Sequence, residues 1–158
     1  MNPNLIIQKL NLEPLPGEGG FFRRTFTSSE KISNISILSS INFLVTQKDF
    51  SALHRLCSSD EIFHFYAGSS FEMIHICQDG TLTKKRFGPD ILAAESPQIV
   101  VPRGVWQGLR VLAPGEWALM GTTVVPEFLY SDFELGKRDE LLTLFPQHQD
   151  TILRYTRE

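Results

Sequence analysis

Two histidines and a carboxylate stand close together near the middle of the chain. His54, Glu61 and His64 fall within eleven residues, on two segments typical of neighbouring strands, residues 50–56 and 61–67. Imidazole and carboxylate groups bind Zn, Fe, Mn or Ni, and they also serve as acid and base in proton transfer. If the two segments fold back on each other as a hairpin, His54 faces Glu61. The spacing therefore predicts a site built on His54 and Glu61, either a metal site or an acid–base pair.

Three further side chains are predicted to bind a ligand beside this pair. Arg23 lies in a strand-like run, where its forked donors suit a carboxylate or a phosphate. Gln107 offers an amide next to a tryptophan. In a regular strand, His64 points to the face opposite Glu61, so only a β-bulge near residue 60 or 61 would turn it inward.

Each candidate also has an alternative interpretation without a ligand. His54 fits a core histidine bonded to the backbone, and Glu61 fits an exposed strand carboxylate. Arg23 fits an exposed cation, His64 a surface or interface histidine, and Gln107 a packed amide with satisfied hydrogen bonds.

The elements that must position these residues are mostly strands. Between residues 21 and 125 the chain alternates short apolar runs with Gly and Pro, which is typical of a β-sandwich or barrel. Asp79 and Gly80 separate two such runs and predict a hairpin with a primed turn.

Both ends of the chain are predicted to be helical. Residues 3–10 form an apolar stripe that Asn2 can cap, and acidic residues at 139 and 140 begin a C-terminal helical region. A second C-terminal segment follows Pro146, and it is expected to bury Ile152, Leu153 and Tyr155 on one face.

Composition restricts the class of protein. The chain has 158 residues, 42% of them hydrophobic and 21% charged, which indicates one globular domain over residues 1–158. A formal net charge of -3 gives no electrostatic basis for nucleic-acid binding. No apolar run approaches the roughly 18–20 residues that span a bilayer, and the N-terminus lacks the features of a signal peptide. We therefore expect a cytoplasmic protein that binds neither nucleic acid nor membrane.

The spacing of the polar residues resembles the first motif of the cupin superfamily. That motif is H-x-H, three or four residues, E, six residues, G, and its positions are held here by His54, Leu56, Glu61 and Gly68. The second motif includes P-x-G-x-x-H, and here its positions are held by Pro102, Gly104 and Gln107.

Two of the four usual cupin metal ligands, His54 and Glu61, are thus retained. Leu56 cannot bind a metal, and Gln107 can do so only weakly, through its amide oxygen.

The whole chain is similar to a small single-domain cupin family of unknown function found in bacteria and yeasts. The resemblance rests on five segments, residues 18–23, 51–54, 60–64, 101–107 and 132–135. It implies an all-β fold, the cupin double-stranded β-helix or jelly-roll barrel, with short N- and C-terminal helices and a ligand-sized cavity. It also implies a homodimer, which would cover exposed sheet edges. It implies no particular reaction, and whether the protein is an enzyme stays open.

Several functions fit this interpretation. The first is binding of a small polar or anionic molecule in the barrel, with or without a divalent metal at His54 and Glu61. The alternative is a sugar-nucleotide epimerase or isomerase that uses His54 as base, although Glu61 stands where those enzymes carry a lysine. A metal-dependent oxygenase or isomerase would need His64 as a further ligand. Nothing in the sequence excludes a non-catalytic binding or storage cupin.

Overall fold

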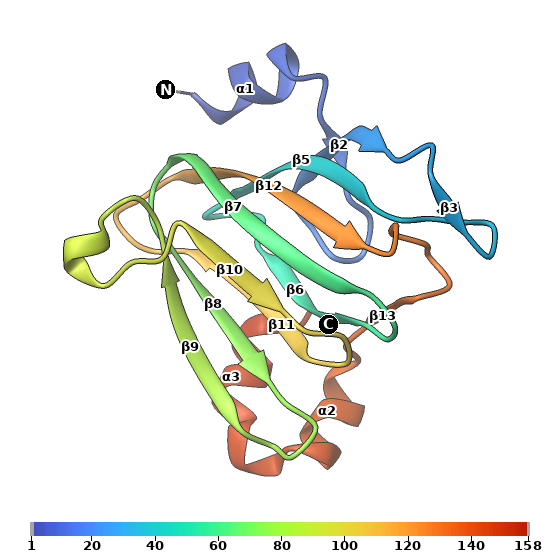
Figure 1. Ribbon diagram of the computed structural model, residues 1–158. Coiled ribbons are helices and arrows are strands. Elements are labelled where there is room, and N and C mark those ends of the chain that lie inside the picture. Colours follow the sequence, from blue (N-terminus) through green and yellow to red (C-terminus); the bar gives the residue numbers. More distant parts are fainter. Residues whose placement is uncertain (1, 158) are drawn as a thin grey trace.

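Two antiparallel sheets face each other and enclose a common interior in the computed structural model, which describes residues 2–157 (Figure 1). The first sheet has six strands in the order β1-β2-β5-β12-β7-β10, and the second has five in the order β13-β6-β11-β8-β9. A separate two-stranded hairpin joins β3 to β4.

The strands of the six-stranded sheet are β1 (Glu13–Pro14), β2 (Phe21–Thr27), β5 (Ser39–Thr46), β7 (Asp60–Gly68), β10 (Gln98–Val101) and β12 (Trp117–Val125). Those of the five-stranded sheet are β6 (Ser51–Leu56), β8 (Phe71–Ile76), β9 (Leu82–Phe87), β11 (Trp106–Val111) and β13 (Phe133–Leu135). The small hairpin consists of β3 (Lys31–Ile32) and β4 (Ile35–Ser36). The helices are α1 (Pro3–Lys9), α2 (Arg138–Leu144) and α3 (Gln149–Tyr155), with 3-10 turns η1 (Ile91–Ala93) and η2 (Pro146–His148).

Alternate side chains of both sheets fill the interior. Phe43 on β5 and Phe63 on β7 meet Met73 on β8 and Leu109 on β11 in one buried cluster. This is the arrangement expected of facing sheets, because successive side chains of a strand point to opposite faces. The predicted all-β jelly-roll fold with terminal helices is confirmed.

The strands that carry His54 and Glu61 do not form the predicted hairpin. β6 pairs with β11 and β13, whereas β7 pairs with β10 and β12, so the two strands belong to opposite sheets. The corner between them is bonded to other segments, since Leu56 O accepts from Gly104 N at 2.7 Å and Cys57 N donates to Asp132 O at 3.0 Å. His54 and Glu61 are therefore brought together across the barrel interior.

The Asp79–Gly80 hairpin does join β8 to β9, but only Gly80 adopts a positive φ, of 83°. A primed turn with a positive φ at both residues is therefore not formed there.

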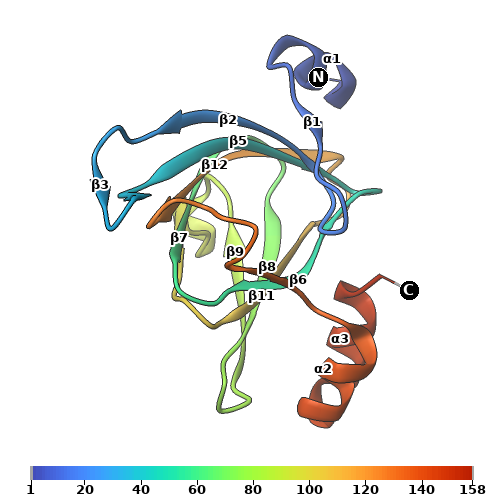
Figure 2. The same ribbon diagram turned by 90° about the vertical axis from the view of Figure 1, so that its right-hand side faces the viewer.

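The C-terminal helices cover the outer face of the five-stranded sheet (Figure 2). Ile152 and Tyr155 of α3 are buried against Leu53 and Ile74, as the sequence predicted. Leu153 was expected on the same face, but it is 42% exposed. Successive helical residues differ by about 100° in direction, so a neighbour of Ile152 points away from the sheet.

The N-terminal helix is confirmed as well. Asn2 caps α1 by accepting a hydrogen bond from Asn4 N at 2.9 Å, and Ile6 packs beside Leu12 and Leu44. Within residues 2–157 no helix is long and apolar enough to cross a membrane. The homodimer and the cytoplasmic location stay predictions.

Candidate functional site

One cavity of about 250 Å³ lies between the two sheets near the β1–β2 connection. Its walls are largely apolar and aromatic, and a few polar side chains reach it from different elements. The aromatic residues that line it are Phe22, Phe43, Phe63, Phe128, Tyr130 and Phe133. The polar and charged residues are Glu18, Arg24, Ser39, His54, Glu61 and Thr122.

His54 on β6 is held in one tautomer. Its Nδ1 lies 2.8 Å from Ala52 O, and because a carbonyl oxygen only accepts, Nδ1 carries the proton. In the neutral ring this leaves a lone pair on Nε2, the nitrogen nearer Glu18. The ring is 4% exposed and stacks on Phe133 with centroids 5.4 Å apart. The histidine is therefore both bonded to the backbone and part of the cavity wall.

Glu61 on β7 is a buried carboxyl bonded across the barrel. Gln107 on β11, in the opposite sheet, donates from Nε2 to Glu61 Oε2 at 2.6 Å. Burial raises the pKa of Glu61 to about 7, and the negative charge of Glu18 adds to this rise. His54 and the hydrogen bonds from Gln107 and Thr122 act in the opposite direction. Glu61 thus exchanges a proton near neutral pH.

Glu18 is a third ionisable group of the site, and our sequence analysis did not select it. It lies between β1 and β2 and is only 8% exposed. Ser51 Oγ donates to Glu18 Oε1 at 2.7 Å, while Oε2 lies 3.9 Å from His54 Nε2. Two carboxyl groups therefore accompany one imidazole inside the cavity.

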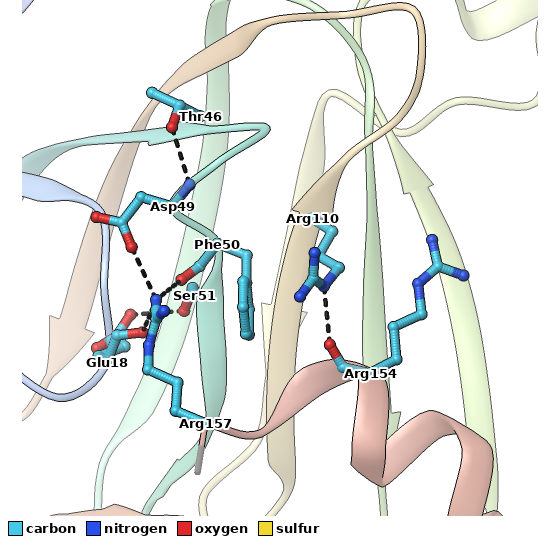
Figure 3. A network of polar contacts seen from close by, with 8 residues as sticks. All are labelled: Glu18, Thr46, Asp49, Phe50, Ser51, Arg110, Arg154 and Arg157. Atoms are coloured by element: carbon cyan, nitrogen blue, oxygen red, sulfur yellow. Dashed lines mark hydrogen bonds and ion pairs between the residues drawn. The ribbon is translucent and has the colours of Figure 1, made fainter.

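The C-terminal segment fixes the backbone that carries Glu18 (Figure 3). Arg157 Nη2 lies 3.2 Å from Glu18 O, 2.8 Å from Asp49 Oδ1 and 2.6 Å from Phe50 O. Glu18 O also accepts from Ala52 N at 2.8 Å, which ties the connection to β6. The position of Glu18 thus depends on a residue far away in the sequence.

The structure bonds Gln107 to Glu61 without placing it among the residues that line the cavity, and it leaves Arg23 and His64 outside the cavity. Arg23 is exposed, and Arg24 lines the cavity in its place. Phe22 pairs with Phe43, and both line the cavity. Because side chains alternate along a strand, Arg24, two residues after Phe22, points to the same side as Phe22, and Arg23 points to the other side. His64 points away from Glu61, as simple alternation requires, and its Nδ1 lies 3.3 Å from Gln98 Nε2.

The residues that sequence reasoning missed had signals of their own. Glu18 precedes Gly19 and Gly20, which both adopt a positive φ, at 99° and 79°. Consecutive glycines of this kind mark a backbone that turns tightly and approaches its neighbours closely. A cavity position for Arg24 would have been predicted if Phe22, rather than Phe21, had been assigned to the interior face.

The donor set around His54 and Glu61 does not fit a transition-metal centre. Metal sites of this kind use three or more protein ligands. Within the described part of the chain no group of three or more His, Cys, Asp or Glu residues is placed to hold a metal ion. Leu56 supplies only hydrocarbon, and Gln107 directs its amide nitrogen, a hydrogen-bond donor, at Glu61. The metal ligation predicted for His54 and Glu61 therefore lacks the ligands that would complete it.

Two facing antiparallel sheets around an internal cavity define a cupin-type barrel. The chain belongs to the family described as Cupin superfamily (DUF985), whose family model matches residues 4–136. The family predicted from the motifs is thereby confirmed.

Solved structures agree with this assignment. A protein from Shewanella oneidensis is 35% identical, with a TM-score of 0.93 over 99% of this chain and 98% of that one. A hypothetical protein from Leishmania major is 30% identical, with a TM-score of 0.94 over the full length of both chains. A dTDP sugar isomerase from Desulfovibrio desulfuricans shares the fold at 17% identity and a TM-score of 0.56, over 85% of each chain. No curated protein matches the chain.

Replacing Gly19 by alanine tests how tightly the Glu18 connection is held. A Cβ at position 19 would lie 1.9 Å from Arg157 Nη2 and 2.4 Å from Phe50 O, at a φ of 99°. We expect Gly19→Ala to lower the free energy of unfolding by about 2–3 kcal/mol or more. In the control Gly17→Ala, φ is 78° and the new Cβ meets only Leu135 Cδ2 at 3.3 Å, so about 1–2 kcal/mol is expected. Urea unfolding measures both, and equal losses would contradict the tight contact.

The raised pKa of Glu61 makes stability depend on pH. Between its ordinary pKa of 4.5 and about 7, folded Glu61 keeps a proton that the unfolded chain has released. The free energy of unfolding therefore falls as pH rises through this window, by up to about 3 kcal/mol. Glu61→Gln keeps a neutral group of similar size and should lack this fall.

Urea unfolding of both proteins at pH 5 and pH 8 measures the effect. Titrating groups away from Glu18, His54 and Glu61 contribute equally to the two proteins and cancel in the comparison. Parallel pH dependences would show that Glu61 titrates normally.

Proposed function

We propose that this protein binds a small molecule inside its barrel, with a polar group of the ligand at Glu18, His54 and Glu61. The observation that carries the proposal is the cavity itself, in which apolar walls surround a few convergent polar atoms. Ligand sites usually have this composition, since the apolar surface supplies affinity and the polar groups fix orientation.

A screen of small aromatic and aliphatic alcohols, amides and amines tests the proposal by methyl NMR. Ligands should shift the methyl resonances of Ile41 and Leu56, which line the cavity, and leave Leu112 unchanged, which borders a separate surface hollow. His54→Ala should weaken the best ligand at least tenfold, because it removes a polar wall of the site. Shifts at Leu112 alone, or none at Ile41 and Leu56, would refute binding in the barrel.

The same site supports a second function, proton transfer on a bound carbonyl compound. His54 Nε2 has the lone pair of a base, while Glu61, whose pKa is raised to about 7, can donate as an acid. The base takes the proton from the carbon next to the carbonyl, a C=C bond forms, and the carbonyl oxygen receives the proton of Glu61. Once the proton on His54 has exchanged with solvent, reversal of these steps regenerates the carbonyl compound with a solvent-derived hydrogen on that carbon. An ionised Glu61 would oppose an enolate, but the neutral acid stabilises the enol.

Proton exchange tests this second function directly. A carbonyl ligand from the screen should exchange its neighbouring C–H for deuterium in D₂O when the protein is present. His54→Gln should slow the exchange by about 10²-fold or more, because the base is lost. His148→Gln, remote from the cavity on η2, serves as the control. Unchanged exchange in His54→Gln would exclude this role while leaving ligand binding intact.

A further inference from the structure

The polar end of the cavity, formed by Glu18, His54 and Glu61, contains two buried carboxyl groups and one imidazole. Arg24 reaches the cavity with a side chain that is 39% exposed, and its guanidinium is engaged elsewhere. It lies 3.8 Å from Glu127 Oε2, and its Nη2 donates to Phe128 O at 3.3 Å.

His75, the other buried histidine of the barrel, adds no positive charge. It lies beside Gln107 in the register of β8 and β11 and is 4% exposed. Burial lowers the pKa of His75 to about 4, and Lys85 lowers it further in the same direction, so the ring is neutral at pH 7.

The polar end also contains unused hydrogen-bonding capacity. Glu18 Oε1 accepts from Ser51, but within residues 2–157 no donor forms a hydrogen bond with Oε2. His54 Nε2 lies 3.9 Å from that oxygen, beyond hydrogen-bond distance, and both side chains are more than nine-tenths buried. A hydrogen-bond donor on a ligand in the cavity could therefore bond to Glu18 Oε2.

The remaining walls suit the body and the charge of a cation. Six aromatic rings line the cavity, and His54 itself stacks on one of them, Phe133. The faces of aromatic rings attract cations, most strongly where water is excluded. An anion would meet two carboxylates at this end without a free guanidinium or ammonium group to receive it.

We propose that the cavity selects a small organic amine, bound as its ammonium ion between Glu18 and Glu61 with its apolar body against the phenylalanine walls. This inference rests on the proposed function, because it names the class of molecule that the same cavity takes. The ammonium group donates its N–H bonds to the carboxylate oxygens. No bond is made or broken.

Three matched probes test the inference by isothermal titration calorimetry. These are 2-phenylethylamine, 2-phenylethanol and 3-phenylpropionate, which share an aromatic body and differ in charge. We expect the amine to bind at least tenfold more tightly than the alcohol at pH 8, and the carboxylate more weakly than either. In Glu18→Gln the preference for amine over alcohol should fall to threefold or less, while affinity for the alcohol is retained. Glu140→Gln on the exposed side of α2 should keep the full preference.

The outcomes separate this inference from the proposed function. Equal or tighter binding of the alcohol or the carboxylate would overturn the amine assignment and leave binding in the barrel intact. An amine preference that survives Glu18→Gln would also overturn it. If none of the three probes binds, the amine assignment is wrong, and the methyl NMR screen decides on the proposed function independently.

Discussion

The hydrogen bond from Gln107 to Glu61 spans the interior and joins the two sheets at the site. A carboxyl group buried in a barrel of phenylalanines carries a large desolvation cost unless it is bonded or protonated. Here it is bonded, at 2.6 Å, by an amide from the opposite sheet, and its pKa is raised to about 7. The hydrogen bond thus links the two sheets at the polar part of the cavity, whereas burial brings the pKa of Glu61 near neutrality against the opposing effect of this bond.

The second constraint is that the connection between β1 and β2 and the C-terminal segment are both held beside His54. The connection that carries Glu18 is bonded to β6 through Ala52 and to the C-terminal segment through Arg157. Ala52 also accepts the Nδ1 proton of His54 through its carbonyl oxygen. One short stretch of β6 therefore orients both the imidazole and the carboxylate beside it. Gly19 is required there because a side chain would collide with Arg157 and Phe50.

Sequence reasoning predicted the fold and the two central residues because both depend on local patterns. Motif spacing identified His54, Glu61 and Gln107, and strand alternation correctly set His64 apart from Glu61. What it missed depends on long-range placement. The hairpin between β6 and β7 was wrong because the chain crosses from one sheet to the other between these two strands. Arg23 was preferred to Arg24 because no local signal showed which phenylalanine faces inward, and Glu18 meets His54 only after the barrel closes.

The two positions at which this chain departs from the metal-binding cupin motif change the chemistry of the site together. Leu56 replaces one ligand with hydrocarbon, and Gln107 replaces another with a donor that is already engaged by Glu61. A metal ion would have supplied positive charge between His54 and Glu61. Without a metal ion, the positive charge that offsets an ionised Glu61 must come from a proton or from a ligand. The raised pKa of Glu61 corresponds to the first of these, and the ammonium ligand that we propose would be the second. Because each would neutralise Glu61, the proposal couples occupation of the cavity to the protonation of that carboxyl group.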